Sequence, residues 1–278
     1  MSSQASSIDK AKNYYNSSDA DEFYFHVWGG EDIHIGLYDP PGIPIRQASR
    51  NTVSKMAKLV EANLKPASKV LDLGAGYGGA ARYLAKTYGC HVTCLNLSEV
   101  ENDRNRDMSQ KAGLSELITV IDGNFENLPF EDSSFDVIWS EDAILHSGNK
   151  PKVFQEVSRV LSQKGDFVFT DPMQSQNCPE GVLQPIYDRI HLDSLGSFDY
   201  YGELAKESGM TQSATLDYSI YLPIHYQSVR DNLVVNRNKL LKNISEEFLN
   251  RMITGLGHWI DGGNKGYLAW GILHFRKS

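Results

Sequence analysis

Strand-like and helical runs alternate between residues 51 and 173, and this alternation is the feature that most restricts the fold. Helical runs carry local start and stop signals: Gly89 ends one, and Ser98 with Glu101 forms a capping box that opens the next. Strands joined by helices in this way pair in parallel, so the pattern predicts an α/β fold with a helix-covered parallel sheet. The five expected strands are 69–73, 91–97, 117–121, 135–139 and 166–171.

The flanks of this region differ from it and suggest a three-part organisation. Residues 1–50 are rich in aromatics and predict a helical N-terminal lid, 51–175 the core, and 176–278 a cap with the closing strands of the same domain. In the last part we expect a long helical region over 228–256. Other expected elements are helices near 181–191 and 200–208 and strands around 215–221 and 266–275.

Composition narrows the class of protein further. The 278 residues contain 27 Lys and Arg against 35 Asp and Glu, a net charge of −8 without any basic run, so we expect no nucleic-acid partner. No apolar stretch reaches about 18 residues, and the first residues lack the apolar region of a secretory signal, so we expect a cytoplasmic protein without a membrane partner. Cys90, Cys94 and Cys178 have no metal-ligand spacing, which predicts neither a disulfide nor a metal site.

A glycine-rich loop follows the first expected strand and opens a helix. Gly74, Gly76 and Gly79 match G-x-G-x-x-G, a pattern that dinucleotide-binding and methyltransferase folds share, and the loop amides would face a ligand. Asp72 helps to separate the two classes, because a carboxylate is unfavourable beside a pyrophosphate but suits the ammonium and sulfonium of S-adenosylmethionine. The alternative is that the glycines only make a tight turn and that Asp72 binds loop amides.

The next two strand ends carry amide side chains. Asn96 ends the second strand, where an amide can bind ribose hydroxyls; an NAD enzyme would have an acid there. Asn124 and Phe125 follow the third strand and suit the amino group and ring face of adenine. Asn96 as a turn residue before the Ser98 cap, and Phe125 as a core residue, remain alternatives.

Together these motifs resemble class I S-adenosylmethionine-dependent methyltransferases over roughly residues 50–175. The D-x-G-x-G loop, the strand-two motif, G-N-F and the run F-D-V-I-W-S carry the resemblance. It implies a Rossmann-like seven-stranded methyltransferase sheet, with a helical cap inserted before the last strands, and S-adenosylmethionine as cofactor. The implied cofactor contacts are Asp72, Gly74, Ala75, Gly76, Asn96, Leu97, Asn124, Phe125 and Ser140.

Candidate acceptor residues lie after the fourth strand and in the lid. Asp142 and His146 are four residues apart, so on a helical turn they would share one face and could receive a polar acceptor; a merely helix-stabilising pair is the alternative. Lid aromatics, among them Tyr24 and Trp28, would be buried by packing over the cofactor cleft, where they could bind a methylammonium. Ordinary core contacts would also explain them.

Nearly the whole chain resembles the glycine/sarcosine/dimethylglycine N-methyltransferases of betaine synthesis and, more distantly, the phosphoethanolamine methyltransferases. The runs W-G-G-E-D-I-H-I-G, D-A-I-L-H and D-R-I-H-L-D-S-L-G carry this resemblance. It implies methylation of sarcosine and dimethylglycine to betaine, with Tyr15 and His146 closing the site and assisting chemistry. We expect His146, or a water that it orients, to act as base, and Asp142 to fix its tautomer.

The substrate carboxylate requires a cation, and Arg189 is our candidate ahead of Arg46, Arg50 and Lys265. Arg189 as an ordinary surface residue is the alternative. The expected partner is a small amine, and a homodimer stays open. Rival functions are a phosphobase N-methyltransferase, which would need more cations, an inactive cofactor-binding regulator, and an NAD-dependent dehydrogenase.

Overall fold

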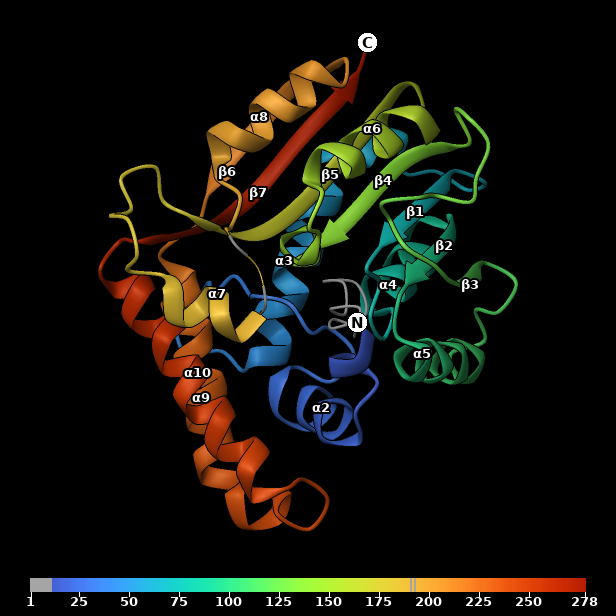
Figure 1. Cartoon of the computed structure of the whole chain (residues 1–278). Coiled ribbons are helices and arrows are strands. Elements are labelled where there is room, and N and C mark those ends of the chain that lie inside the picture. Colours follow the sequence, from blue (N-terminus) through green and yellow to red (C-terminus); the bar gives the residue numbers. More distant parts are fainter. Residues whose placement is uncertain (1–11, 191, 193) are drawn as a thin grey trace, which may run out of the picture.

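The computed structural model describes residues 12–190, 192 and 194–278, and its centre is one seven-stranded sheet of order β3-β2-β1-β4-β5-β7-β6 (Figure 1). β1 to β5 pair in parallel, and β7 runs antiparallel to both β5 and β6. The expected Rossmann-like methyltransferase sheet is confirmed. The strands are β1 (Lys69–Leu73), β2 (His91–Asn96), β3 (Ile118–Asp122), β4 (Phe135–Glu141), β5 (Leu161–Gln174), β6 (Met210–Asp217) and β7 (Leu268–Lys277).

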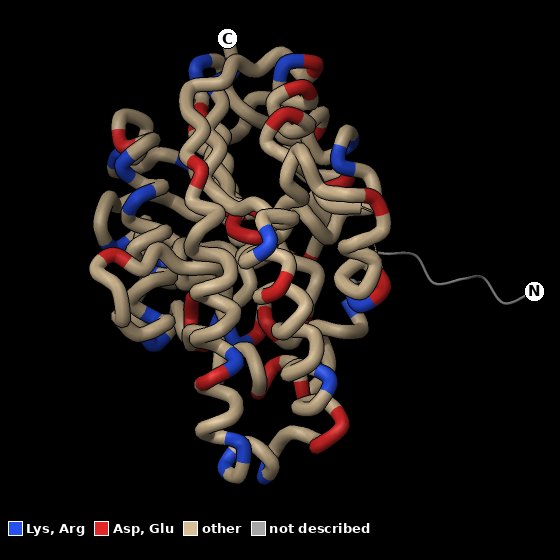
Figure 2. Tube along the Cα trace, turned by 90° about the vertical axis from the view of Figure 1, so that its left-hand side faces the viewer, with Lys and Arg blue, Asp and Glu red and all other residues tan. Residues whose placement is uncertain are grey.

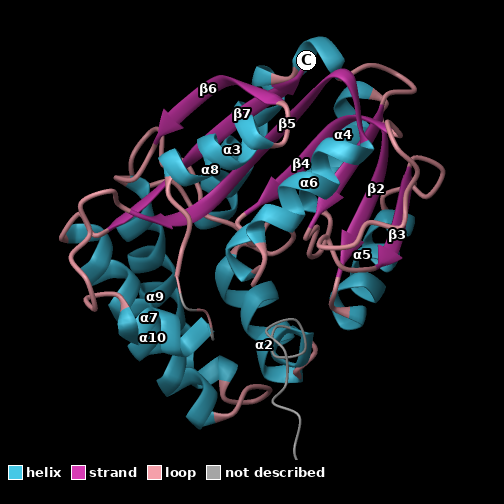
Figure 3. Cartoon of the chain, turned by 45° about the horizontal axis from the view of Figure 1, so that its top comes forward, coloured by secondary structure: helices cyan, strands magenta, loops and turns pink. Residues whose placement is uncertain are grey.

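Helices cover both faces of the sheet (Figure 3). On one face α3 (Ile45–Leu59) and α4 (Gly79–Tyr88) share a buried cluster with β4, in which Met56 and Leu84 pack with Trp139. On the other face α6 (Lys150–Val160) and α8 (Phe198–Glu207) bury Phe154 and Tyr201 against β5. α5 (Glu99–Lys111) packs on β2 and β3.

The strand order reverses direction between β1 and β4, and ligands of open α/β sheets bind at the carboxyl edge beside such a switch. The glycine loop after β1 and the short helix η3 (Ile144–His146) after β4 both lie at this edge. The N-terminal segment covers it: residues 12–15 are helical, and α2 (Ser18–Phe23) and η1 (Tyr24–Trp28), a π-helical turn, follow.

The expected long helical region over 228–256 is two helices, which corrects the prediction. α9 (Tyr221–Leu240) and α10 (Glu246–Asn264) form a pair that extends beyond the sheet, with α7 (Gln184–Ile190) against α10 (Figure 1). Ser245 separates them, because its hydroxyl accepts the amide N–H of Phe248 and starts a new helix. β6 ends at Asp217, four residues before the expected end of that strand, because α9 begins at Tyr221.

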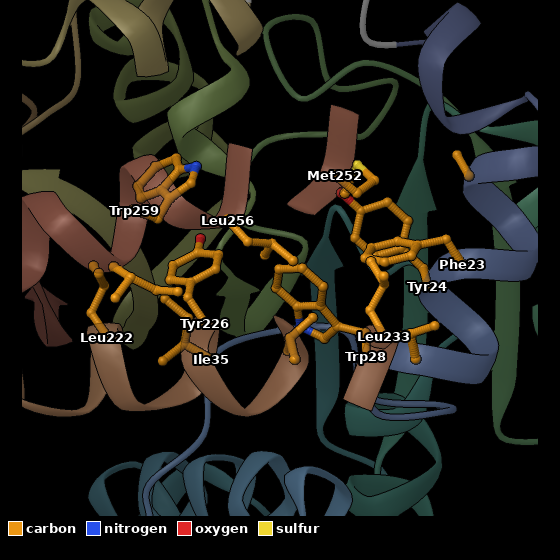
Figure 4. Packing of buried hydrophobic residues seen from close by; sticks show 14 of the residues in the cluster. Phe23, Tyr24, Trp28, Ile35, Leu222, Tyr226, Leu233, Met252, Leu256 and Trp259 are labelled. Carbon is orange, nitrogen blue, oxygen red and sulfur yellow. The ribbon is translucent and has the colours of Figure 1, made fainter. Parts of the chain in front are cut away.

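Aromatic side chains join the N-terminal segment to this helix pair. Trp28 packs edge-on against Tyr226 of α9, with ring centroids 5.6 Å apart (Figure 4). Phe23 packs similarly against Phe248 of α10 at 5.9 Å. Phe23 is fully buried and Trp28 is 7% exposed. The lid aromatics are therefore core residues as well as candidate ligand contacts.

Charged residues of both signs are interspersed along the chain trace (Figure 2). None of the described helices combines the length and the apolarity that crossing a bilayer requires.

Candidate active site

Two cavities meet at the carboxyl edge of the sheet. The larger, of about 720 Å³, lies between the N-terminal segment and α7 and α10, and the smaller, of about 80 Å³, runs along the glycine loop and the end of β2. Because some residues line both cavities, these residues mark the place where a ligand in one would meet a ligand in the other. The shared residues are Tyr15, Tyr24, Ile33, Asp142 and His146.

Tyr15 and His146 are hydrogen-bonded across this junction. The Tyr15 hydroxyl lies 3.0 Å from His146 Nε2. Burial, assisted by the charge of Lys150, lowers the pKa of His146 to about 4, and burial raises the pKa of Tyr15. Both rings are therefore neutral near pH 7, and with the imidazole proton on Nδ1 the tyrosine donates to His146.

Asp142 does not form the expected pair with His146. Its backbone has a φ of 50° and lies before η3 instead of within a helical turn. One carboxylate oxygen accepts the amide N–H of Ile35 at 2.6 Å and the other accepts the indole N–H of Trp270 at 2.8 Å. Asp142 therefore lines the junction while joining the sheet to the N-terminal segment, and the expectation that it fixes the tautomer of His146 is wrong.

Beneath the junction lies an acidic pocket. Asp32, Asp72 and Glu141 line it together with His34, Gly74 and Ala75. Glu141 lies 3.3 Å from His34 Nε2, and Asp32 pairs with Arg50 at 2.8 Å. Asp72 is 3% exposed and makes no hydrogen bond or ion pair with any described residue. Burial, with Glu141 and Asp32 nearby, raises the pKa of Asp72 well above its usual range.

The sequence matches known methyltransferases. Residues 71–169 match a family model described as a methyltransferase domain. A sarcosine/dimethylglycine N-methyltransferase of Halorhodospira halochloris is 51% identical over 98% of this chain and 97% of its own length. The chain belongs to the sarcosine/dimethylglycine N-methyltransferase family.

Two further relatives extend the comparison. A glycine/sarcosine/dimethylglycine N-methyltransferase of Actinopolyspora halophila is 53% identical over 98% of this chain, which spans about half (48%) of that relative. A crystal structure from Galdieria sulphuraria, assigned as a sarcosine dimethylglycine methyltransferase, superposes with a TM-score of 0.91 at 46% identity, over 95% of this chain and 99% of the other. The expected family is thus confirmed.

The glycine-loop cavities of this N-methyltransferase fit S-adenosylmethionine. Asp72 is a buried carboxylate with no hydrogen-bond donor in the part of the chain that the structure describes, which suits the ammonium of the methionine part, and Gly74, Ala75 and Gly76 bring backbone close to it. Gly74 has a φ of 73°, and a Cβ there would lie 2.4 Å from that of Ala143. Glycine is therefore required at this turn.

Glu101 is a candidate ribose ligand that the sequence analysis missed. It lines the smaller cavity along the glycine loop, called the cofactor cavity from here on, together with Asn96 and Leu97. Glu101 is 4% exposed and accepts a hydrogen bond from Asn96 Nδ2 at 2.8 Å. Burial raises its pKa to about 7. Half of the expected capping box is present, since Ser98 Oγ accepts the Glu101 amide, but the Glu101 side chain faces the cavity instead of returning to Ser98. An acid thus reaches the usual ribose position from the helix.

Three predicted cofactor residues after β3 and in β4 have different placements. Phe125 lines the cavity as expected. Asn124 is not among the lining residues, and its side-chain oxygen accepts the Glu126 amide. Ser140 is fully buried, and its hydroxyl donates to the Leu73 carbonyl, joining β4 to β1. The structure therefore gives Ser140 a role in the sheet, and the expected contacts of Asn124 and Ser140 gain no support from it.

The larger cavity, called the acceptor cavity from here on, has aromatic walls and two arginines. Arg189 lies in it with Nη2 3.1 Å from the sulfur of Met252, and has no carboxylate partner among the described residues. Arg46 and Arg50 instead pair with Glu31. Lys265 is not among the lining residues. The walls are completed by five residues of the cap, Tyr226, Arg251, Met252, His258 and Trp259. The sequence analysis missed them because no local motif marks them.

Asp72→Asn tests the fit of the acidic pocket. We expect affinity for S-adenosylmethionine to fall at least tenfold at pH 8, because the ammonium loses its counter-charge. Binding a cation favours the carboxylate, so in the parent protein affinity should rise with pH up to the raised pKa of free Asp72. Calorimetry across pH measures both effects.

Asp122→Asn is the matched control, since this carboxylate ends β3, two strands away from β1 in the same sheet, and is not among the residues that line the glycine-loop cavity or the acidic pocket. Equal affinity in Asp72→Asn and Asp122→Asn would contradict the assignment of the ammonium site.

Proposed function

We propose that the protein transfers methyl groups from S-adenosylmethionine to sarcosine and dimethylglycine, giving betaine. The observation that carries this is the junction of the two cavities, where the Tyr15–His146 pair faces both. A cofactor on the glycine loop and a small amine in the larger cavity would meet there. The 51% sequence identity to the Halorhodospira halochloris relative, over nearly the full length of both chains, supports the same reaction.

The acceptor cavity suits a zwitterion that carries a methylated amine. Tyr24, Trp28, Tyr226 and Trp259 offer aromatic surface to a methylammonium, and Arg189 offers a guanidinium to the carboxylate. Trp28 Nε1 is buried without a hydrogen-bond partner among the described residues, which leaves a further donor beside this cavity. Both charges of the amino acid therefore find partners at the site.

Methyl transfer needs an amine with a free lone pair, so the ammonium of the substrate must lose a proton. Tyr15 can accept this proton on its phenolic oxygen while its own proton passes to His146 Nε2, 3.0 Å away. Burial holds the pKa of Tyr15 high, so the phenol relays a proton and does not remain a phenolate. The bound cofactor supplies an electrophilic methyl group, and the aromatic walls exclude water from it.

A phosphobase acceptor is less well served. A phosphate dianion would call for several cations, and of the Lys and Arg residues described only Arg189 and Arg251 line the acceptor cavity. An inactive regulator would also have no need for the Tyr15–His146 hydrogen bond between the two cavities. A cytoplasmic location stays a prediction from the sequence, and the question of a homodimer stays open.

An acceptor panel tests the function directly. With labelled S-adenosylmethionine, we expect label in sarcosine and dimethylglycine and at least 100-fold less in phosphoethanolamine, because the cavity matches one carboxylate. Scintillation counting after chromatographic separation measures the products. Transfer of label to phosphoethanolamine but not to dimethylglycine would overturn the proposal.

His146→Ala and Tyr15→Phe test the proton path. We expect kcat to fall by about 10²-fold or more in His146→Ala and by at least tenfold in Tyr15→Phe, with affinity for the cofactor changed less. Initial rates and calorimetry give both quantities. Tyr14→Phe removes the neighbouring hydroxyl, which contacts Tyr24 and Met252 instead of His146, and should cost less. Parent-like turnover in both test variants would remove the pair from the mechanism.

Arg189→Met tests the carboxylate site. We expect KM for dimethylglycine to rise about 10- to 100-fold with a smaller change in kcat, because a charge-assisted hydrogen bond is lost in ground and transition states alike. KM for dimethylethanolamine, which lacks the carboxylate, should hardly move. Lys265→Met is the control. A similar rise in KM for both acceptors would show that Arg189 acts on something other than the carboxylate.

A further inference from the structure

The turn that carries His146 is held by two buried ionisable residues from neighbouring elements. Lys150, at the start of α6, donates from Nζ to the carbonyl of Leu145 at 3.2 Å and to that of Ser147 at 3.0 Å, the residues on either side of His146. Asp171 of β5 accepts the amide N–H of Leu145 at 3.0 Å. Both polar groups of the Leu145 backbone are thus fixed by side chains.

These side chains are themselves firmly placed. Asp171 is fully buried, and its second oxygen accepts the hydroxyl of Tyr201 at 2.5 Å. Lys150 is 8% exposed, and as a buried ammonium it carries a large desolvation cost that helix α6 alone does not require. The two carbonyls that its Nζ binds flank His146, so the buried charge is placed where it holds this turn.

The charge of Lys150 also acts on the ring of His146. Lys150 is the charged neighbour that lowers the pKa of His146 further, after burial. The nearby carboxylates bind other groups than the His146 ring: Glu126 accepts the hydroxyl of Ser147 in the same turn at 2.6 Å, and Asp142 is bound by Ile35 and Trp270. The titratable and charged groups around His146 are Tyr15 and Tyr24 of the N-terminal segment, Glu126, Asp142, Lys150 of α6, Asp171 of β5 and Arg189 of α7.

We propose that Lys150 and Asp171 are positioning residues of the methyl-transfer site, which fix the backbone beside His146 and, through the Lys150 ammonium, oppose protonation of its ring. This inference rests on the proposed function only in taking His146 as the proton acceptor. Lys150 touches the backbone of the turn and acts on the reaction through His146.

Lys150→Met tests both parts, because it keeps the aliphatic stem and removes the donors and the charge. We expect kcat at the pH optimum to fall about tenfold, since the His146 turn loses its anchor. The acidic limb of the kcat profile should move up by about one pH unit, because a cation that disfavoured the imidazolium is gone. KM for the cofactor should stay within about twofold, which separates this effect from general damage.

Three further variants make the result decisive. Lys150→Arg keeps the charge and should leave the acidic limb in place. Lys150→Gln keeps donors without the charge, so it should show the moved limb with a smaller loss of kcat, and it serves if Lys150→Met does not fold. Lys152→Met is the matched control: this lysine lies two residues along α6, is half-exposed with Nζ 3.4 Å from Glu156, and its loss should leave the protein like the parent.

Titration of His146 by NMR of histidine-labelled protein, assigned with His146→Ala, gives a reading that needs no turnover. We expect the midpoint to rise in Lys150→Met and Lys150→Gln and to stay in Lys150→Arg. An unmoved midpoint in folded Lys150→Gln would overturn the inference whatever the acceptor is. If sarcosine and dimethylglycine receive no label but the His146 midpoint moves, the proposed function is rejected and the effect of Lys150 on His146 stands.

Discussion

The Asp142 carboxylate joins the three parts of the chain that build the site. Asp142 itself follows β4, its partner Ile35 belongs to the N-terminal segment, and its other partner Trp270 lies on β7. A buried carboxylate is stable only when its oxygens are hydrogen-bonded, so closing the N-terminal segment over the sheet edge satisfies it. Both oxygens point to Ile35 and Trp270, and no hydrogen bond joins Asp142 to His146 among the described residues, so other groups hold the turn that carries His146.

The carboxyl edge of the sheet also gathers acidic side chains whose mutual repulsion a cationic ligand would reduce. Asp32, Asp72 and Glu141 line one pocket, where Arg50 and His34 oppose two of them and Asp72 remains without a donor among the described residues. Burial raises the pKa of Glu141 to about 7, and burial also raises the pKa of Asp72 well above its usual range. A ligand that brings an ammonium replaces this repulsion with attraction, so the acidic pocket favours a cationic cofactor.

Sequence reasoning predicted the elements whose signals are local. The parallel strands, the glycine loop and the helix start at Ser98 follow from periodicity and capping, and all are present. Glu101 was missed because its capping-box spacing offered a sufficient local explanation, although its side chain turns to the cavity. Asp142 was misassigned because its spacing from His146 suggested a helical turn, whereas a positive φ and two distant partners determine where it points.

The acceptor cavity could not be predicted in full because its walls come from opposite ends of the chain. Trp28 and Tyr24 meet Tyr226 and Trp259 only after the N-terminal segment packs on α9 and α10 (Figure 4). No residue on either side forms an aromatic enclosure alone, so the enclosure depends on the same apolar contacts that hold the segment in place. Water exclusion at the methyl-transfer junction is therefore coupled to the packing of the N-terminal segment. A weakened contact between Trp28 and α9 would open the site to solvent even where every polar residue of the junction is intact.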